Sequence, residues 1–153
     1  MLLCVHAGVG ALVGRRLPGR AAAVLLGIGA HAALDAIRHV DNGGDDPAAV
    51  DGLACLADAL LAAVGIASLG LLGGWGSRAT LGAISGALPD LELALPWNRG
   101  SLGDARFLFP SHAVARLHSC LSPFPLSLRV QAALAAFVWV LALSAAAPGR
   151  GES

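Results

Sequence analysis

The sequence predicts an all-α protein, a polytopic transmembrane helical bundle of four to five helices. Of its 153 residues, 56% are hydrophobic and only 13% are charged, and the mean hydropathy is +0.72. A soluble domain of this length normally carries about a quarter charged residues to cover its surface. Nothing alternates with a period of two over a useful length, which argues against a β-barrel. Residues 1–153 are therefore expected to form a single membrane-embedded helical domain.

Apolar stretches of different lengths define the expected helices. Two of them lack ionisable residues over about the length that crosses a hydrocarbon core: Ala59 to Ser77 and Val130 to Gly149. Three others contain ionisable side chains and are expected to be shielded from lipid or to lie at an interface: Met1 to Gly14, Ala21 to Val40 and Ala79 to Trp97. A short helix is expected after Pro110, because proline is tolerated in a first turn and Ser111 is a good cap.

Small residues recur at four-residue spacing within three of these stretches: Gly10 and Gly14, Gly70 and Gly74, and Gly82 and Gly86. In lipid this spacing lets helix backbones approach closely, within one chain or between copies of it. A chain with 20 glycines also produces such pairs by chance, so composition alone is an equal alternative.

The charges exclude one class of partner and suggest an orientation. Ten basic and ten acidic residues leave no net charge, which argues against nucleic-acid binding. The first connection is basic (Arg15, Arg16 and Arg20) and the second is acidic (Asp41, Asp45, Asp46 and Asp51). The positive-inside tendency therefore places the first connection in the cytoplasm, and Arg78 in the third agrees. Three arginines in the fourth disagree, unless Ala79 to Trp97 does not cross completely.

Ionisable groups inside apolar stretches are the informative feature of the sequence. An aspartate at the centre of a membrane helix costs about 2.5 to 3.5 kcal/mol on insertion scales, so it needs a partner. His31, Asp35 and His39 are spaced four residues apart and would form one stripe on a helix. Imidazole and carboxylate groups together suit zinc or another divalent first-row metal. Alternatively, the pattern is an intrahelical hydrogen bond or a capped helix end.

Other elements offer further candidate ligands, each with a structural alternative. Asp58 could join the same pocket or could be a carboxylate near the membrane surface. Asp90 follows Pro89, so it could project from a proline-broken helix or simply mark a helix boundary. His112 and His118 are six residues apart and would face well apart on one regular helix, so one of them is expected at the site; His118, flanked by Arg116 and Ser119, is the preferred candidate. A lone imidazole such as His6 is more often a satisfied interior group than a ligand.

Two other kinds of chemistry are disfavoured. Cys4, Cys55 and Cys120 form no CxxC pair, which argues against a disulfide framework and a thiolate zinc site. The chain has no phosphate-binding glycine loop, and its serines lack the Gly-x-Ser-x-Gly elbow of serine hydrolases.

The order of these motifs resembles a known family. It combines His6, His31-x-x-Leu34-Asp35 with His39-x-Asp41, Asp58, Leu88-Pro89-Asp90, and His118 before Pro125-Leu126 and Gln131. This arrangement resembles small bacterial inner-membrane metal-dependent hydrolases, grouped as LexA-binding, inner-membrane-associated hydrolases. The chain departs from the family pattern at Arg38, where proline is frequent, and at His118-Ser119, where a His pair and Asn are frequent.

The resemblance implies a helical bundle in the bacterial inner membrane that holds a divalent metal, most simply zinc, and acts on a phosphoester or lipid head group. The ligands it implies are His6, His31, Asp35, His39, Asp41, Asp58, Asp90 and His118. Asp35 or Asp90 would bridge metals or act as general base, and Arg38 or Arg116 would contact a phosphate oxygen. Two alternatives remain: a noncatalytic protein that passes protons or metal ions, and a structural bundle whose polar groups neutralise one another.

Overall fold

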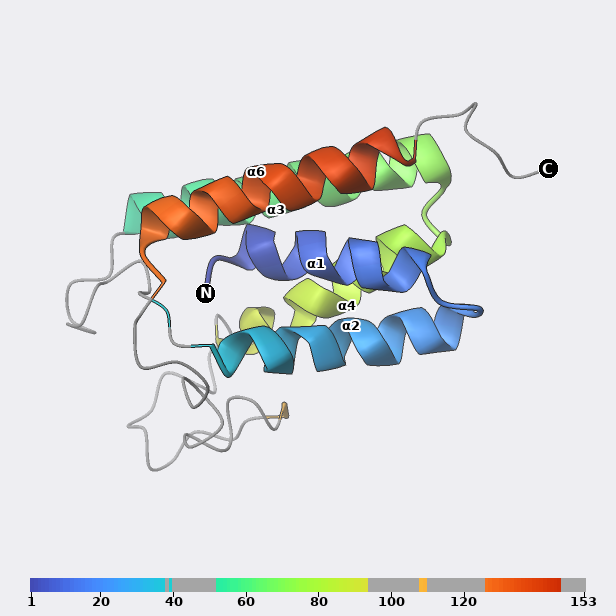
Figure 1. Ribbon diagram of the computed structural model, residues 1–153, viewed down its shortest axis with the longest axis horizontal. Coiled ribbons are helices and arrows are strands. Elements are labelled where there is room, and N and C mark those ends of the chain that lie inside the picture. The colour runs from blue at the N-terminus through green and yellow to red at the C-terminus, as the bar shows by residue number, and fades with distance from the viewer. Residues whose placement is uncertain (38, 40–51, 94–107, 110–125, 147–153) are drawn as a thin grey trace.

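The computed structural model describes residues 1–37, 39, 52–93, 108–109 and 126–146. Within these ranges the chain forms five α-helices and no sheet, and a single isolated bridge joins His39 to Leu126. The helices are α1 (Leu3–Arg15), α2 (Arg20–Asp35), α3 (Gly52–Gly73), α4 (Arg78–Leu93) and α6 (Leu128–Ser144). The expectation of an all-helical fold is confirmed (Figure 1).

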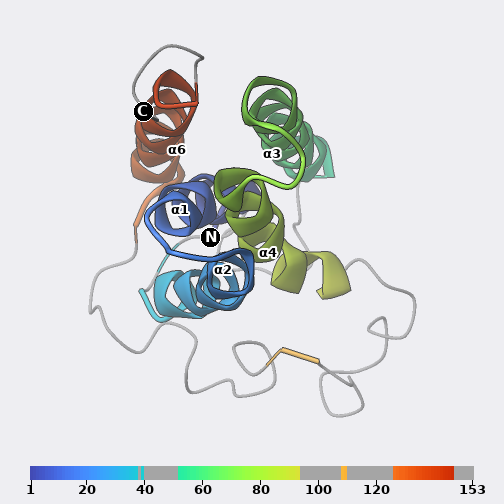
Figure 2. The ribbon, with the colours of Figure 1, turned by 90° about the vertical axis from the view of Figure 1, so that its right-hand side faces the viewer.

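The helices are arranged around a central pair. Seen end-on in Figure 2, α1 and α4 lie in the middle, α2 lies on one side of them, and α3 and α6 lie on the other. Helix α1 packs most extensively on α4, whereas α3 and α6 barely contact each other. The core is built mainly from small side chains, including Ala7, Ala11, Ala62 and Ala83.

Helix α3 is the one helix in the described ranges that is long and apolar enough to cross a membrane. Its 22 residues extend about 33 Å at 1.5 Å per residue, against a hydrocarbon core of about 30 Å. It begins at Gly52, ahead of the expected start at Ala59, and includes Asp58. Helix α6 begins close to the expected position but has only 17 residues, so it is shorter than the stretch predicted from hydropathy.

Pro89 does not end a helix, which was one of the two expectations for it. It lies inside α4, which continues to Leu93 and therefore carries Asp90 on a regular helical turn. Proline has no N–H to donate to the carbonyl four residues earlier, which here belongs to Ser85. The side chain of Ser85 is a separate group: its buried hydroxyl donates to the carbonyl of Gly82 at 3.1 Å. The structure shows neither the helix boundary nor the broken helix expected at Pro89, because α4 is continuous there and carries Asp90.

Two of the three small-residue pairs lie at one seam between α1 and α4. A Cβ atom added to Gly10 would overlap the backbone carbonyl of Gly82, and one added to Gly82 would overlap the carbonyl of Gly10. Gly14 and Gly86 continue the seam in the same way, against backbone atoms of Arg78 and His6. The spacing therefore brings two backbones of the same chain into contact, as small-residue packing in membranes allows.

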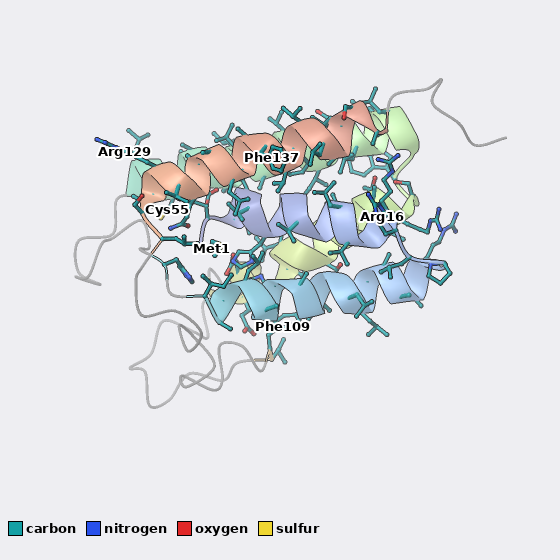
Figure 3. The ribbon with its side chains drawn as sticks, in the orientation of Figure 1. Met1, Arg16, Cys55, Phe109, Arg129 and Phe137 are labelled. Carbon is teal, nitrogen blue, oxygen red and sulfur yellow. The ribbon has the colours of Figure 1, made fainter. Side chains whose placement is uncertain are left out.

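The two ends of the bundle differ in charge. The α1–α2 and α3–α4 connections lie at the same end, where the guanidinium of Arg78 donates to the carbonyl of Leu17. Arg15, Arg16 and Arg20 are also at this end, and Figure 3 shows Arg16 there and Arg129 at the opposite end. The first residues of α1, α3 and α6 and the last residues of α2 and α4 lie at that opposite end (Figure 1).

Candidate metal centre

Three helices bring four ionisable side chains together at the end of the bundle opposite the arginine-rich connections. His6 comes from the second turn of α1, His31 and Asp35 from the last turns of α2, and Asp90 from the last turns of α4. The four-residue spacing of His31 and Asp35 places both on the face of α2 that packs on α1 and α4. His6, His31 and Asp35 are buried, while the Asp90 side chain remains 20% exposed. Asp90 is therefore the member closest to solvent.

The imidazole Nε2 atoms of both histidines face the same two carboxylates. His31 Nε2 lies 2.9 Å from Asp35 Oδ2 and 3.7 Å from Asp90 Oδ1. His6 Nε2 lies 3.2 Å from Asp35 Oδ1 and 3.9 Å from Asp90 Oδ2. One ligand atom each from His6, His31 and Asp90 falls within a sphere where all separations are 4.8 Å or less. These three residues could hold a metal ion, with Asp35 directly beside both imidazoles.

A backbone contact orients the His31 ring. Its Nδ1 lies 2.8 Å from the carbonyl oxygen of Gly86, and a carbonyl can only accept, so Nδ1 carries a proton. In the neutral ring, Nε2 then presents its lone pair to the two carboxylates. A histidine that ligates a metal through one nitrogen typically donates its other N–H to a carbonyl or carboxylate in this way. The Gly86 contact is thus compatible with a metal ion at His31 Nε2.

The charges of the group are compatible with a bound cation. Two carboxylates bring two negative charges, and protons on the histidines or one doubly charged ion could contribute to their balance. The rings of His6 and His31 are stacked with centroids 3.9 Å apart, so two imidazolium charges would repel strongly in a buried site. His6 Nδ1 is buried and has no hydrogen-bond partner within the described residues. A divalent ion facing the Nε2 atoms balances the carboxylates without that repulsion.

Comparisons with protein-family models, with curated proteins and with solved structures find no match to this chain. The chemistry of the site therefore has to be argued from its own geometry.

Of the remaining residues expected at the site, some bind backbone groups and the others lie outside the described residues. Asp58 is buried, but its oxygens accept the backbone N–H groups of Leu3 and Cys4 at 2.7 Å and 3.0 Å. His39 follows the end of α2, and its Nδ1 donates to the carbonyl of Ile37 at 2.6 Å. Other expected participants lie outside the described residues: Asp41 and His118, and with them Arg38, His112 and Arg116.

Three further polar groups were not among the expected site residues. The carbonyl of Gly86 carries no side-chain signal at all. Gln131 is fully buried, accepts from the N–H of Leu2 at 2.9 Å and donates to the carbonyl of Leu126 at 3.0 Å. Glu92 is buried and accepts the N–H of Leu108 at 2.7 Å. For Gln131 and Glu92 the available signal was a polar residue within an apolar stretch.

Proposed function

We propose that this protein is a membrane-bound, metal-dependent hydrolase that binds zinc through His6, His31 and Asp90 and acts on a phosphoester at the bilayer surface. The main support is that two imidazole Nε2 atoms converge on two carboxylates and that the Gly86 carbonyl orients His31. Zinc favours mixed nitrogen and oxygen ligand sets of this kind. The sequence resemblance to inner-membrane hydrolases points to the same chemistry.

A membrane location is supported by the surface of α3. Only 28% of the most apolar 18-residue stretch of α3 is buried, whereas the core helix of a soluble protein is mostly buried. Leu53, Val64 and Leu71 are 76%, 63% and 80% exposed. Contiguous exposed apolar surface of this kind marks an interaction with lipid or another apolar partner. The arginine-rich end then faces the cytoplasm by the positive-inside tendency, and the His/Asp group faces the other side.

The residues of the group would divide the work by exposure. A divalent ion in this position supplies Lewis acidity, which acidifies bound water and neutralises phosphoryl charge. Asp35, buried beside both imidazole Nε2 atoms, would add a second carboxylate next to the ion. Asp90, the more exposed carboxylate, would bind the ion through one oxygen and accept a proton from an attacking water through the other.

The binding step is tested by zinc content in detergent-purified protein. The double variant Asp35→Asn, Asp90→Asn removes both anionic charges but keeps the side-chain shapes. We expect its zinc content to fall about tenfold or more relative to wild type, because metal sites lose affinity steeply when ligands are removed. Glu92→Gln on the same helix is the matched control, since Glu92 binds backbone N–H groups, and it should retain zinc. Equal zinc content in the wild type and the double variant would refute the site.

Catalysis is tested separately on the zinc-loaded protein. Release of phosphate from a phosphomonoester, or of the head group from a phospholipid, should exceed that of the double variant. Zinc binding without turnover of either substrate would replace the hydrolase with an ion-handling protein, the second function compatible with a buried His/Asp group in a membrane.

A further inference from the structure

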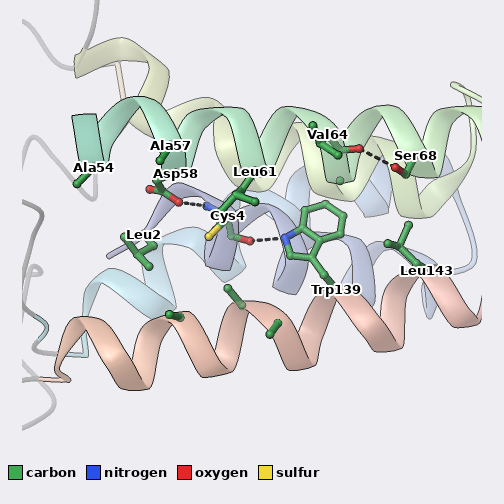
Figure 4. A pocket seen from close by; sticks show the side chains of 14 residues that line it. Leu2, Cys4, Ala54, Ala57, Asp58, Leu61, Val64, Ser68, Trp139 and Leu143 are labelled. Atoms are coloured by element: carbon green, nitrogen blue, oxygen red, sulfur yellow. Dashed lines mark hydrogen bonds between the residues drawn. The ribbon is translucent and has the colours of Figure 1, made fainter. Parts of the chain in front are cut away.

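An apolar groove runs between α3 and α6 on the side of α1 facing away from the His/Asp group. It has a volume of about 520 Å³, within the range of ligand pockets. Its walls are small or apolar side chains, among them Ala57, Leu61, Val64 and Ala136, and its base is formed by Cys4 of α1 and by Leu2, which precedes that helix (Figure 4). The groove exists because α3 and α6 both pack on α1 but scarcely on each other.

The polar atoms that line this groove are hydrogen-bonded within the protein. Trp139 Nε1 donates to the carbonyl of Cys4 at 2.9 Å, so the indole is fixed with its ring over Gly65 (Figure 4). The hydroxyl of Ser68 donates to the carbonyl of Val64 at 2.8 Å. Asp58 binds the first N–H groups of α1, whose dipole favours its negative charge. A ligand in the groove therefore needs no hydrogen-bonding groups along most of its length.

The dimensions of the groove favour a slender ligand over a helix. The lining residues extend on α3 from Ala54 to Ser68, which is about 21 Å at 1.5 Å per residue. Even if all the empty space of the groove is counted, about 1080 Å³, its mean cross-section is roughly 51 Å², whereas a helix about 10 Å in diameter needs roughly 80 Å². A single hydrocarbon chain fits, because nonbonded carbons pack about 3.5 to 4.0 Å apart.

An exposed positive charge lies at one end of the groove, where the Asp58 carboxylate is already hydrogen-bonded to the first turn of α1. Arg129 is exposed at the start of α6, one helical turn before the lining residue Ala132, and has no ion-pair partner in the described part of the chain. Figure 3 shows its side chain at the outer end of α6. The N-termini of α3 and α6 add positive potential there. An anionic group at this end and an apolar tail along the groove would match both features.

We propose that the groove between α3 and α6 binds one acyl chain of an anionic phospholipid, with the phosphate of that lipid at Arg129. This proposal rests on the membrane location given under the proposed function, but not on the metal site. The His/Asp group lies on the other face of α1, so the lipid has a structural or anchoring role there, separate from the reaction.

Trp139 provides the readout, because an acyl chain in the groove contacts its ring. In detergent-solubilised protein with Trp75→Phe and Trp97→Phe, dibrominated phosphatidylglycerol should quench the fluorescence of Trp139 saturably. Ala136→Leu fills the groove and should weaken this binding about tenfold. Ala133→Leu, an exposed alanine of α6 outside the groove, should leave it unchanged. Arg129→Gln should reduce the preference for phosphatidylglycerol over phosphatidylcholine about fivefold.

Two results would overturn the proposal. Unsaturable quenching that is equal in Ala136→Leu and Ala133→Leu would show only nonspecific contact with the micelle. Conversion of a dimer to a monomer by Ala136→Leu, measured by light scattering, would make a second copy of the chain the ligand of the groove. Loss of zinc affects neither readout, so failure here is distinguishable from failure of the metal site.

Discussion

Asp58 stabilises the first turn of α1 from a neighbouring helix. Residue Leu2, at the N-cap position, makes no side-chain cap, and the carboxylate of Asp58 accepts the N–H groups of Leu3 and Cys4 in its place. The first N–H groups of a helix have no partner within it, so a carboxylate there satisfies two donors and the helix dipole together. A buried aspartate in an apolar span thus has a structural use that does not involve a metal.

Replacing this carboxylate should therefore affect stability and leave zinc binding intact. Asp58→Ala leaves two N–H groups without a partner, and we expect it to lower the free energy of unfolding by about 1 to 3 kcal/mol. Asp58→Asn keeps one acceptor oxygen and should lose less. Thermal unfolding in detergent and zinc content measure the two effects. A loss of zinc at unchanged stability would instead make Asp58 a ligand.

At the residue scale, the sequence predicted the part of the His/Asp group that comes from a single helix. The spacing of His31 and Asp35 on one helix was sufficient to expect their contact at 2.9 Å. His6 was ambiguous as a lone imidazole, because its contact with Asp35 depends on how α1 packs against α2. The separation of Asp58 from the group depends on packing between α3 and α1, which no spacing within one segment encodes.

At the scale of elements, the glycine seam between α1 and α4 predicts a sharp contrast between two glycines. Gly10→Ala would place a methyl group inside the backbone of α4 and should destabilise the protein by about 1 to 3 kcal/mol. Gly29→Ala in α2 meets no atom within 4 Å and should stabilise it by about 0.5 to 1 kcal/mol through helix propensity. Unfolding followed by circular dichroism compares the two variants. Similar stabilities would mean that α1 and α4 do not touch.

Helix positions followed well from hydropathy, while helix ends followed less well. The expected helix from Met1 to Gly14 matches α1 closely, because Arg15 and Arg16 end the apolar stretch. Helix α2 stops at Asp35 although the expected stretch ran to Val40, and the carboxylate of Asp35 is held there by two histidines from different helices. Such an end is set by tertiary contacts, which outweigh local propensity.

At the scale of the whole molecule, the unequal ends of the bundle predict its orientation. Pro18 lies in the arginine-rich α1–α2 connection and Leu128 at the opposite end. In a protein without native cysteines, Leu128→Cys should react with a membrane-impermeant maleimide in intact cells. Pro18→Cys should react only after the membrane is opened, because arginines are retained on the cytoplasmic side. The opposite labelling pattern would place the His/Asp group in the cytoplasm.

The extensive contact between α1 and α4 also has a consequence for biosynthesis. Helix α1 leaves the ribosome first, yet its largest packing partner is made only after α2 and α3 are complete. Until then, the glycine surface of α1 has no backbone to pack against, and His6 cannot meet Asp90. Closure of the polar group is therefore a late event of co-translational assembly, and a chain truncated before Arg78 should be a substrate for quality-control proteases.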